Sequence, residues 1–250
     1  MPNHVTNRFT ITGTREARLG FKRAFLAEIR EPGPDGQEIL AARFDFERII
    51  PMPEVIRATE SSSSVSSGLL VLGRPEIQTD GFGTESLEDK VACYLAYPWV
   101  KAAGVDDYEG LKALLIERDP SCVAKAEIAI RAYEEYGHAS WHSWSIANWG
   151  TKWNSYSFRL IAEEDDLLDF SIDTAWSPPE PIFAALAKRT ECTDIEIAVR
   201  CFDEGWMFAC RGVISGGHYL LANVEPDPAF YEEVYGVPCT SEEDEEETQA

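Results

Sequence analysis

The stretch SYSFRLIAEEDDLLDFSIDTAW, residues 155–176, decides the fold class of this chain. Apolar and polar residues alternate through both of its halves, which is typical of β-strands with one buried face. Four acidic residues, Glu163 to Asp166, separate the halves and favour a turn. We therefore predict an antiparallel hairpin with strands over 154–162 and 167–174.

A second strand pair follows the first. The segments 194–202 and 206–214 alternate in the same way, and the turn sequence DEG joins them. The sequence HYLLANV after this pair predicts one more strand, and DPAFYEEVYG predicts a short closing helix. Between the two pairs, SPPEPIFAALAKR predicts a helix in which Ser177 is the N-cap.

The N-terminal residues predict a strand, a helix and another strand. Residues 4–12, HVTNRFTIT, alternate and are expected to join the sheet. Thr14 then caps a helix whose apolar positions recur at helical spacing as far as Ile29. After a loop rich in Pro and Gly, ARFDFERIIPMP predicts a short strand with Phe44 and Phe46 on one face.

The middle of the chain has a different pattern. Residues 58–68, ATESSSSVSSG, are polar and low in complexity, which predicts a mobile segment. Helical periodicity follows, and we expect helices over about 85–97, 106–118, 120–136 and 139–148.

Together these elements predict an α+β fold in which helices cover an antiparallel, ferredoxin-like sheet, with an inserted helical subdomain. Residues 1–57 and 148–238 would form the discontinuous ferredoxin-like domain, and 58–147 the helical insertion. Residues 239–250 include the run SEEDEEE and predict a disordered acidic tail.

The charge of the chain restricts its partners. Its 250 residues include 44 acidic and 22 basic ones, so the net charge is −22. The electrostatic field of so much negative charge repels nucleic-acid phosphates and attracts basic protein surfaces. We therefore expect no direct binding of nucleic acid and a basic, nucleic-acid-binding protein as the partner, although acidity can also serve solubility alone.

The sequence also argues against a membrane location. Apolar runs such as GLLVLG at 68–73 are far shorter than the roughly 20 residues that a bilayer requires. The start, MPNHVTNRFT, has neither the basic nor the apolar region of a secretory signal. We expect the protein to stay in the cytoplasm and to contact no membrane.

The segments MPNHVTNRFTITG, FDFERIIPMP, NWGTKWN, FSIDTAWSPPEPIFAAL and CFDEGWMFACRG occur in this order along the chain. Together they resemble the YubB-like family, over about residues 1–56 and 146–215. The resemblance implies a ferredoxin-like domain and an origin on a plasmid, phage or genomic island, hence a bacterial host. It implies no activity and no site residues, because the function of that family is not established.

A tryptophan-rich stretch, WHSWSIANWGTKWNSYSF at 141–158, has two interpretations. Clustered tryptophan usually packs a core, and we expect Trp149, Trp153 and Trp176 to lie between a helix and the sheet. Alternatively, the stretch forms a shallow pocket for a small ligand. That candidate pocket would use Asn148, Trp149, Lys152, Trp153 and Asn154.

The sequence shows no motif for catalysis or metal binding. His138 and His142 share a helix face, but no third ligand has a suitable spacing, and the six cysteines form no CxxC pair. Neither a GxSxG motif nor a phosphate-binding loop occurs. We expect no metal and no cofactor, and the sequence does not support an enzyme.

The main hypothesis is therefore a non-enzymatic inhibitor of a host defence system, of the anti-CRISPR or anti-restriction type. Its carboxylates would act as a DNA mimic and occupy the basic channel of a CRISPR effector or restriction enzyme, as phosphates do. The alternatives are a small-ligand or nucleotide-processing enzyme that uses NWGTKWN, and a plasmid or phage maintenance module. The acidic interaction surface is predicted to comprise Glu163, Glu164, Asp165, Asp166, Asp169, Asp173, Glu180, Asp194, Glu196, Asp203 and Glu204.

Overall fold

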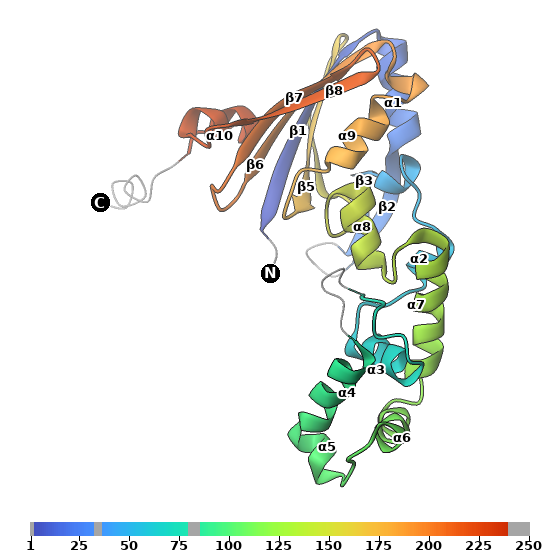
Figure 1. Ribbon diagram of the computed structural model, residues 1–250. Coiled ribbons are helices and arrows are strands. Elements are labelled where there is room, and N and C mark those ends of the chain that lie inside the picture. Colours follow the sequence, from blue (N-terminus) through green and yellow to red (C-terminus); the bar gives the residue numbers. More distant parts are fainter. Residues whose placement is uncertain (1–2, 33–36, 80–85, 240–250) are drawn as a thin grey trace, which may run out of the picture. The chain divides into compact units, whose positions relative to one another are not determined.

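A computed structural model describes residues 3–32, 37–79 and 86–239 of the chain (Figure 1). The chain divides into two compact units, one of residues 1–51 and 148–250, the other of residues 52–147. We call them unit 1 and unit 2, and each is described by itself. The sequence placed these boundaries after residues 57 and 147. Apart from Cys239, the predicted acidic tail lies outside the described residues.

Unit 1 is built around an antiparallel sheet. Within the described residues, its strands follow the order β4-β5-β1-β6-β7-β8, and all neighbouring strands run in opposite directions. The strands are β1 (His4–Gly13), β4 (Tyr156–Glu163), β5 (Leu167–Ala175), β6 (Ile195–Asp203), β7 (Ala209–Ser215) and β8 (His218–Val224). The predicted antiparallel sheet is confirmed.

The connections of this sheet explain its order. Helix α1 (Arg15–Phe25) follows β1, while α9 (Glu180–Leu186) and the short 3₁₀ helix η2 (Thr190–Cys192) connect β5 to β6 across β1. The order β4-β5-β1-β6 with helical crossovers is that of a split β-α-β, ferredoxin-like sheet. Strands β7 and β8 extend it at one edge. The predicted α+β fold class is therefore confirmed.

Helices α1 and α9 lie on the same side of the sheet (Figure 1). The odd-numbered residues of β1 from Val5 to Ile11 are all buried, as the period of a strand requires. The Phe9 ring stacks on that of Phe170 in β5, with 5.0 Å between centroids, and lies 5.9 Å from the ring of Phe183 in α9. Each buried phenylalanine stabilises the fold by about 1.5–3 kcal/mol relative to an exposed one.

The opposite side of the sheet carries α10 (Pro228–Tyr235) (Figure 1). Phe230 and Val234 of this helix form a buried cluster with Phe202 of β6 and Ala209 of β7. The sheet thus has covering elements on both sides, and charged residues of its second face become partly enclosed.

A separate hairpin follows α1, and it corrects two predictions. The predicted helix as far as Ile29 is wrong, because Leu26 has an extended backbone and begins β2 (Leu26–Pro32), which pairs with β3 (Glu38–Phe44). The predicted strand through Phe46 is also too long. Asp45 caps the 3₁₀ helix η1 (Phe46–Arg48) with its side chain and so ends the strand.

Unit 2 is helical. Its helices are α2 (Glu54–Arg57), α3 (Ser63–Val71), α4 (Leu87–Ala96), α5 (Pro98–Ala102), α6 (Tyr108–Arg118), α7 (Cys122–Tyr136) and α8 (Trp141–Trp149). The last of these continues into unit 1. The four helices expected from the sequence correspond to α4, α6, α7 and α8, with ends that differ by at most two residues.

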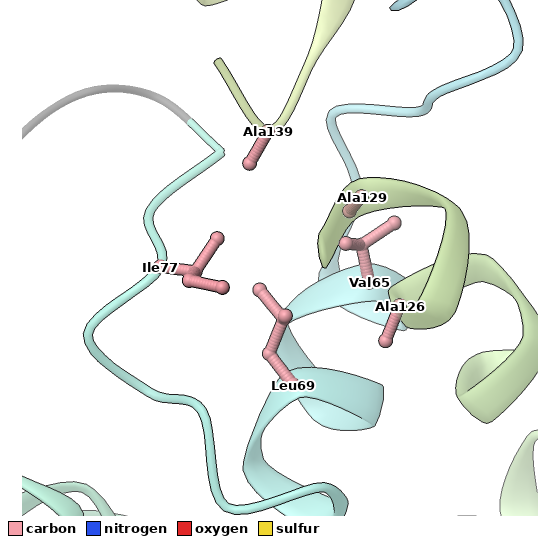
Figure 2. Close-up of a cluster of buried hydrophobic side chains, with 6 residues drawn as sticks. All are labelled: Val65, Leu69, Ile77, Ala126, Ala129 and Ala139. Atoms are coloured by element: carbon pink, nitrogen blue, oxygen red, sulfur yellow. The ribbon is translucent and has the colours of Figure 1, made fainter. Parts of the chain in front are cut away.

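The prediction of a mobile segment over 58–68 is wrong, because much of it belongs to α3. Val65 and Leu69, one helical turn apart on α3, pack against Ala126 and Ala129 of α7 (Figure 2). Burial of an apolar stripe stabilises a short helix more than residue preference does. The serine-rich composition therefore gave a misleading prediction.

Gly68 allows α3 and α7 to approach closely. A Cβ atom at this position would lie 2.0 Å from the carbonyl oxygen of Cys122 and 2.7 Å from the Cβ of Ala126. No side chain fits into that space without separating the two helices.

In the described part of the chain, no helix combines the length and apolarity that a bilayer crossing requires.

Candidate functional site

Trp149, the last residue of α8, belongs to the core. Its side chain is 4% exposed, its ring lies 6.1 Å from that of Phe46, and its Nε1–H donates to the carbonyl of Ile50 at 2.9 Å. Gly150 follows with a φ of 77°, and a Cβ there would lie 2.7 Å from Pro181. Glycine is thus required at this turn, and the predicted burial of Trp149 is confirmed.

Trp153 and Trp176 were also expected in the core, and this prediction is wrong. Their side chains are 37% and 42% exposed. The ammonium of Lys152 lies 4.7 Å from the ring centroid of Trp153 and 5.1 Å from that of Trp176, so the three form a cation–π cluster. Trp153 lies in the irregular segment between α8 and β4, which explains why no helix and sheet enclose its ring.

Asn154 has a structural role. Its Oδ1 accepts from the backbone N–H of Phe46 at 3.0 Å and of Ser155 at 2.8 Å, while its Nδ2 donates to Asp45 at 2.7 Å. These bonds hold the chain before β4 against η1. Asn148 is half-buried within α8. Of the five residues in the predicted ligand pocket, Trp149 and Asn154 therefore make contacts that support the fold.

A pocket of about 370 Å³ nevertheless lies beside Trp153, and we call it the Tyr156 pocket. The hydroxyl of Tyr156 lies 2.7 Å from Nδ1 of His4, and the two rings meet edge to face. Burial, followed by the negative charges of Asp173 and Glu204, raises the pKa of Tyr156 to about 12. The phenol therefore keeps its proton at neutral pH. The pocket is lined by His4, Arg43, Trp153, Asn154, Ser155 and Tyr156.

The structure divides the predicted acidic surface into separate groups. Six of the carboxylates lie at the end of β1, because Thr12 pairs with Leu167 on one side and with Glu196 on the other. Glu180 and Glu204 are exposed outside this group. Glu204 lies near the start of β1, where its carboxylate accepts from the backbone N–H of His4 at 2.8 Å. We call the group of six the acidic end: Glu163, Glu164, Asp165, Asp166, Asp194 and Glu196.

The remaining three carboxylates of the predicted surface take part in internal contacts. Asp169 is 5% exposed and pairs with Arg8 at 2.8 Å. Asp173, on the same face of the sheet, pairs with an arginine of β4 at 3.5 Å. Asp203 is fully buried and accepts from the backbone N–H of Met207 in the turn between β6 and β7. These three carboxylates stabilise the fold and are not part of an exposed array.

The turn at the acidic end has a fixed backbone. Arg18 of α1 is 3% exposed, and its guanidinium donates to the carbonyls of Gly13 at 3.2 Å and Glu164 at 2.9 Å, and to that of Asp165. Because Arg18 binds carbonyl oxygens, it does not neutralise the carboxylates of the same residues. No pattern in the sequence indicates this role of Arg18.

The carboxylates of the turn differ in their partners. Lys22 pairs with Glu163 at 2.7 Å. Within the described ranges, no ion pair engages Glu164, Asp165 or Asp166, and all three side chains are exposed. A cleft of about 270 Å³ lies between α1 and this turn. The acidic end therefore presents three consecutive exposed carboxylates without an ion pair, beside a cleft that Arg15, Arg18 and Lys22 also line.

The other reactive groups in the described ranges do not gather into a site. Among the described residues, no group of three His, Cys, Asp or Glu side chains is arranged to hold a metal ion. Cys201 and Cys210 lie opposite each other on the neighbouring strands β6 and β7. Burial raises the pKa of both thiols, which keeps them in the unreactive, protonated form.

Comparisons with known proteins leave the function open. No known protein family matches the sequence, and no curated protein matches it. By structure, the chain is similar to a protein api92 from Yersinia pseudotuberculosis, described as family-model DUF1281. The sequence identity is 10% and the TM-score is 0.40, over 90% of this chain and 98% of that one.

Proposed function

We propose that this protein is a non-enzymatic, acidic binding protein that inhibits a host protein that handles nucleic acid, such as a CRISPR effector or a restriction enzyme. The observation that carries the proposal is the acidic end. Its exposed carboxylates would occupy a channel lined by Lys and Arg, at positions that nucleic-acid phosphates otherwise take.

Two features of the acidic end support this role. The turn from Glu163 to Asp166 is held by Arg18 through its backbone, so binding would not require the turn to be ordered first. Such preorganisation lowers the entropic cost of association. Asp194 and Glu196 lie across β1 from this turn, about 10 Å away at the usual strand spacing. Together they form an array that is wider than one loop.

The charge of the whole chain supports the same role. A net charge of −22 raises the rate of encounter with a basic surface and disfavours the binding of DNA or RNA itself. The resemblance to the YubB-like family adds the expectation of an origin on a mobile element, where inhibitors of host defence are useful to the element.

The proposal can be tested with bacterial strains that each carry one CRISPR or restriction system. Expression of the wild-type chain is expected to restore phage plaque formation in at least one strain. The triple variant Glu164→Lys, Asp165→Lys and Asp166→Lys should lose this effect. A matched control, Asp106→Lys, Glu117→Lys and Glu135→Lys, makes the same change in net charge at exposed positions of unit 2 and should keep it.

Binding of the purified target should weaken as salt is raised, because exposed charges are screened beyond about 8–10 Å at physiological ionic strength. DNA or RNA that the target binds should compete with the protein. If no strain is rescued, or if the triple variant rescues as well as the control, the proposal is wrong.

A further inference from the structure

The Tyr156 pocket lies apart from the acidic end. His4 begins β1, whereas the acidic end surrounds the last residues of that strand, around Thr12 and Gly13. Over nine residues, a strand extends about 30 Å. The pocket therefore cannot belong to the same binding surface, and an inference from it does not depend on the function proposed above.

Arg43 is the residue that points to a ligand. It comes from β3 and lines the pocket, and its Nε–H is buried without an acceptor. In the part of the chain that the structure describes, no carboxylate pairs with its guanidinium. Buried polar atoms without a partner are rare, and a partly desolvated cation without a counter-charge destabilises a fold. An anion bound in the pocket would remove both costs.

The other walls of the pocket are aromatic. The rings of Trp153 and Tyr156 lie 6.4 Å apart at an angle of 62°, and Trp153 is 37% exposed. The exposed indole of Trp153, with the half-buried ring of Tyr156 beside it, can bind a flat ring by stacking or edge contacts. The Tyr156 hydroxyl and His4, which are bonded to each other at 2.7 Å, supply hydrogen-bonding groups at the side of the pocket where β1 begins.

We propose that the Tyr156 pocket binds a small planar aromatic ligand that carries one anionic group, either a carboxylate or a phosphomonoester. The anionic group pairs with the guanidinium of Arg43, and the ring packs against Trp153 and Tyr156. Asp173 and Glu204 lie close enough to Tyr156 to act on its charge. They disfavour a second anionic group at that side, so polyphosphates are poor ligands.

Titration calorimetry with defined probes tests this assignment. Indole-3-acetate presents a carboxylate, and uridine 5′-monophosphate presents a phosphomonoester. The probe that binds with the lower Kd shows which of these two anionic groups the pocket prefers. We expect a Kd between about 10 μM and 1 mM for at least one of them, as for a small ligand in an open pocket. Acetate and inorganic phosphate lack the aromatic ring, and uridine lacks the anionic group. Each of the three should bind at least about tenfold more weakly.

Variants connect the binding to the pocket. Arg43→Met keeps most of the side chain's length and removes its charge, and it should weaken binding at least about tenfold. Trp153→Ala should weaken it about three- to tenfold, through loss of the ring contact. Arg23→Met removes an exposed arginine of α1 and serves as the matched control, with a change of less than about twofold. Circular dichroism confirms that each variant is folded.

Several outcomes would overturn the proposal. One is the absence of saturable binding by either probe up to about 10 mM, tenfold above the weakest expected Kd. A second is equal binding by uridine and its monophosphate together with no binding of indole-3-acetate. The third is a folded Arg43→Met variant that binds the probes as tightly as the Arg23→Met control.

Discussion

Replacement of Asp169 by Ala should destabilise unit 1 far more than the same change at Asp166. Asp169 accepts three hydrogen bonds from Arg8, from Nε at 3.1 and 3.2 Å and from Nη2 at 2.8 Å. Hydrogen bonding to Asp169 raises the pKa of Arg8. Nη1 of Arg8 donates to the carbonyl of Glu233 at 2.9 Å, so the pair also holds α10 on the sheet.

The structure sets the size of the effect. Removal of one partner from a fully buried ion pair costs about 3–5 kcal/mol, because the other charge stays desolvated. The side chains of Arg8 and Asp169 are 17% and 8% exposed. Water therefore reaches part of the guanidinium, and we expect a loss of about 2–4 kcal/mol for Asp169→Ala. For a domain of this size, Tm would fall by roughly 5–15 °C.

Urea denaturation followed by circular dichroism measures this loss. Asp166 is exposed, so Asp166→Ala should change the free energy of unfolding by about 0.5 kcal/mol or less. A double-mutant cycle with Arg8→Ala should give a coupling above about 1 kcal/mol. If Asp169→Ala is as stable as Asp166→Ala, or if the cycle shows no coupling, the pair is only a surface contact and the reasoning fails. Because Asp169 stabilises the fold, reversal of its charge would lower stability as well as any binding. A binding test with that variant could not separate the two effects.

Further predictions concern the core, the helix contact and pH. Trp149→Ala should cost about 3–5 kcal/mol in urea denaturation, and Trp153→Ala at most about half of that, because only Trp149 is buried. Gly68→Ala should destabilise the protein by about 1–3 kcal/mol despite the better helix propensity of alanine, because its Cβ would overlap the Cys122 carbonyl; a more stable variant would contradict this. Between pH 10 and 12 the folded state holds the Tyr156 proton that the unfolded state has lost, so stability is full below pH 10 and falls as the pH rises. Alkaline melting curves of Tyr156→Phe should therefore fall less steeply over this range than those of the wild-type protein.

The sequence predicted the sheet well because its signals are local. Alternation along 155–176 and 194–214 indicates which residues share a face, and the short acidic turns fix the pairing of neighbouring strands. The same local signals failed where tertiary packing decides. The helix that begins at Arg15 ends at Phe25 because Leu26 pairs with Phe44, and no residue near Leu26 indicates that partner.

The candidate sites were less predictable for the same reason. The Tyr156 pocket combines His4, Arg43 and Tyr156 from three different strands, and a single sequence does not show which distant residues meet. Asp169 is different, since it alternates with the apolar Leu168 and Phe170 and thus lies on the other face of the sheet. Its burial depends on Arg8 and α10, which the spacing of acidic residues does not reveal.

The position of β1 between the two candidate sites leads to a prediction of independence. His4 at one end of the strand contributes to the Tyr156 pocket, and Gly13 at the other end contributes its carbonyl to Arg18. Sites about 30 Å apart on a sheet that is paired on both sides have no shared side chain through which to interact. Reversal of the acidic end should therefore leave the Kd of the probes unchanged, and Arg43→Met should leave the rescue of phage unchanged. If either variant altered the other readout, the two surfaces would have to be coupled through the sheet, and binding of the small ligand would then regulate binding of the protein target.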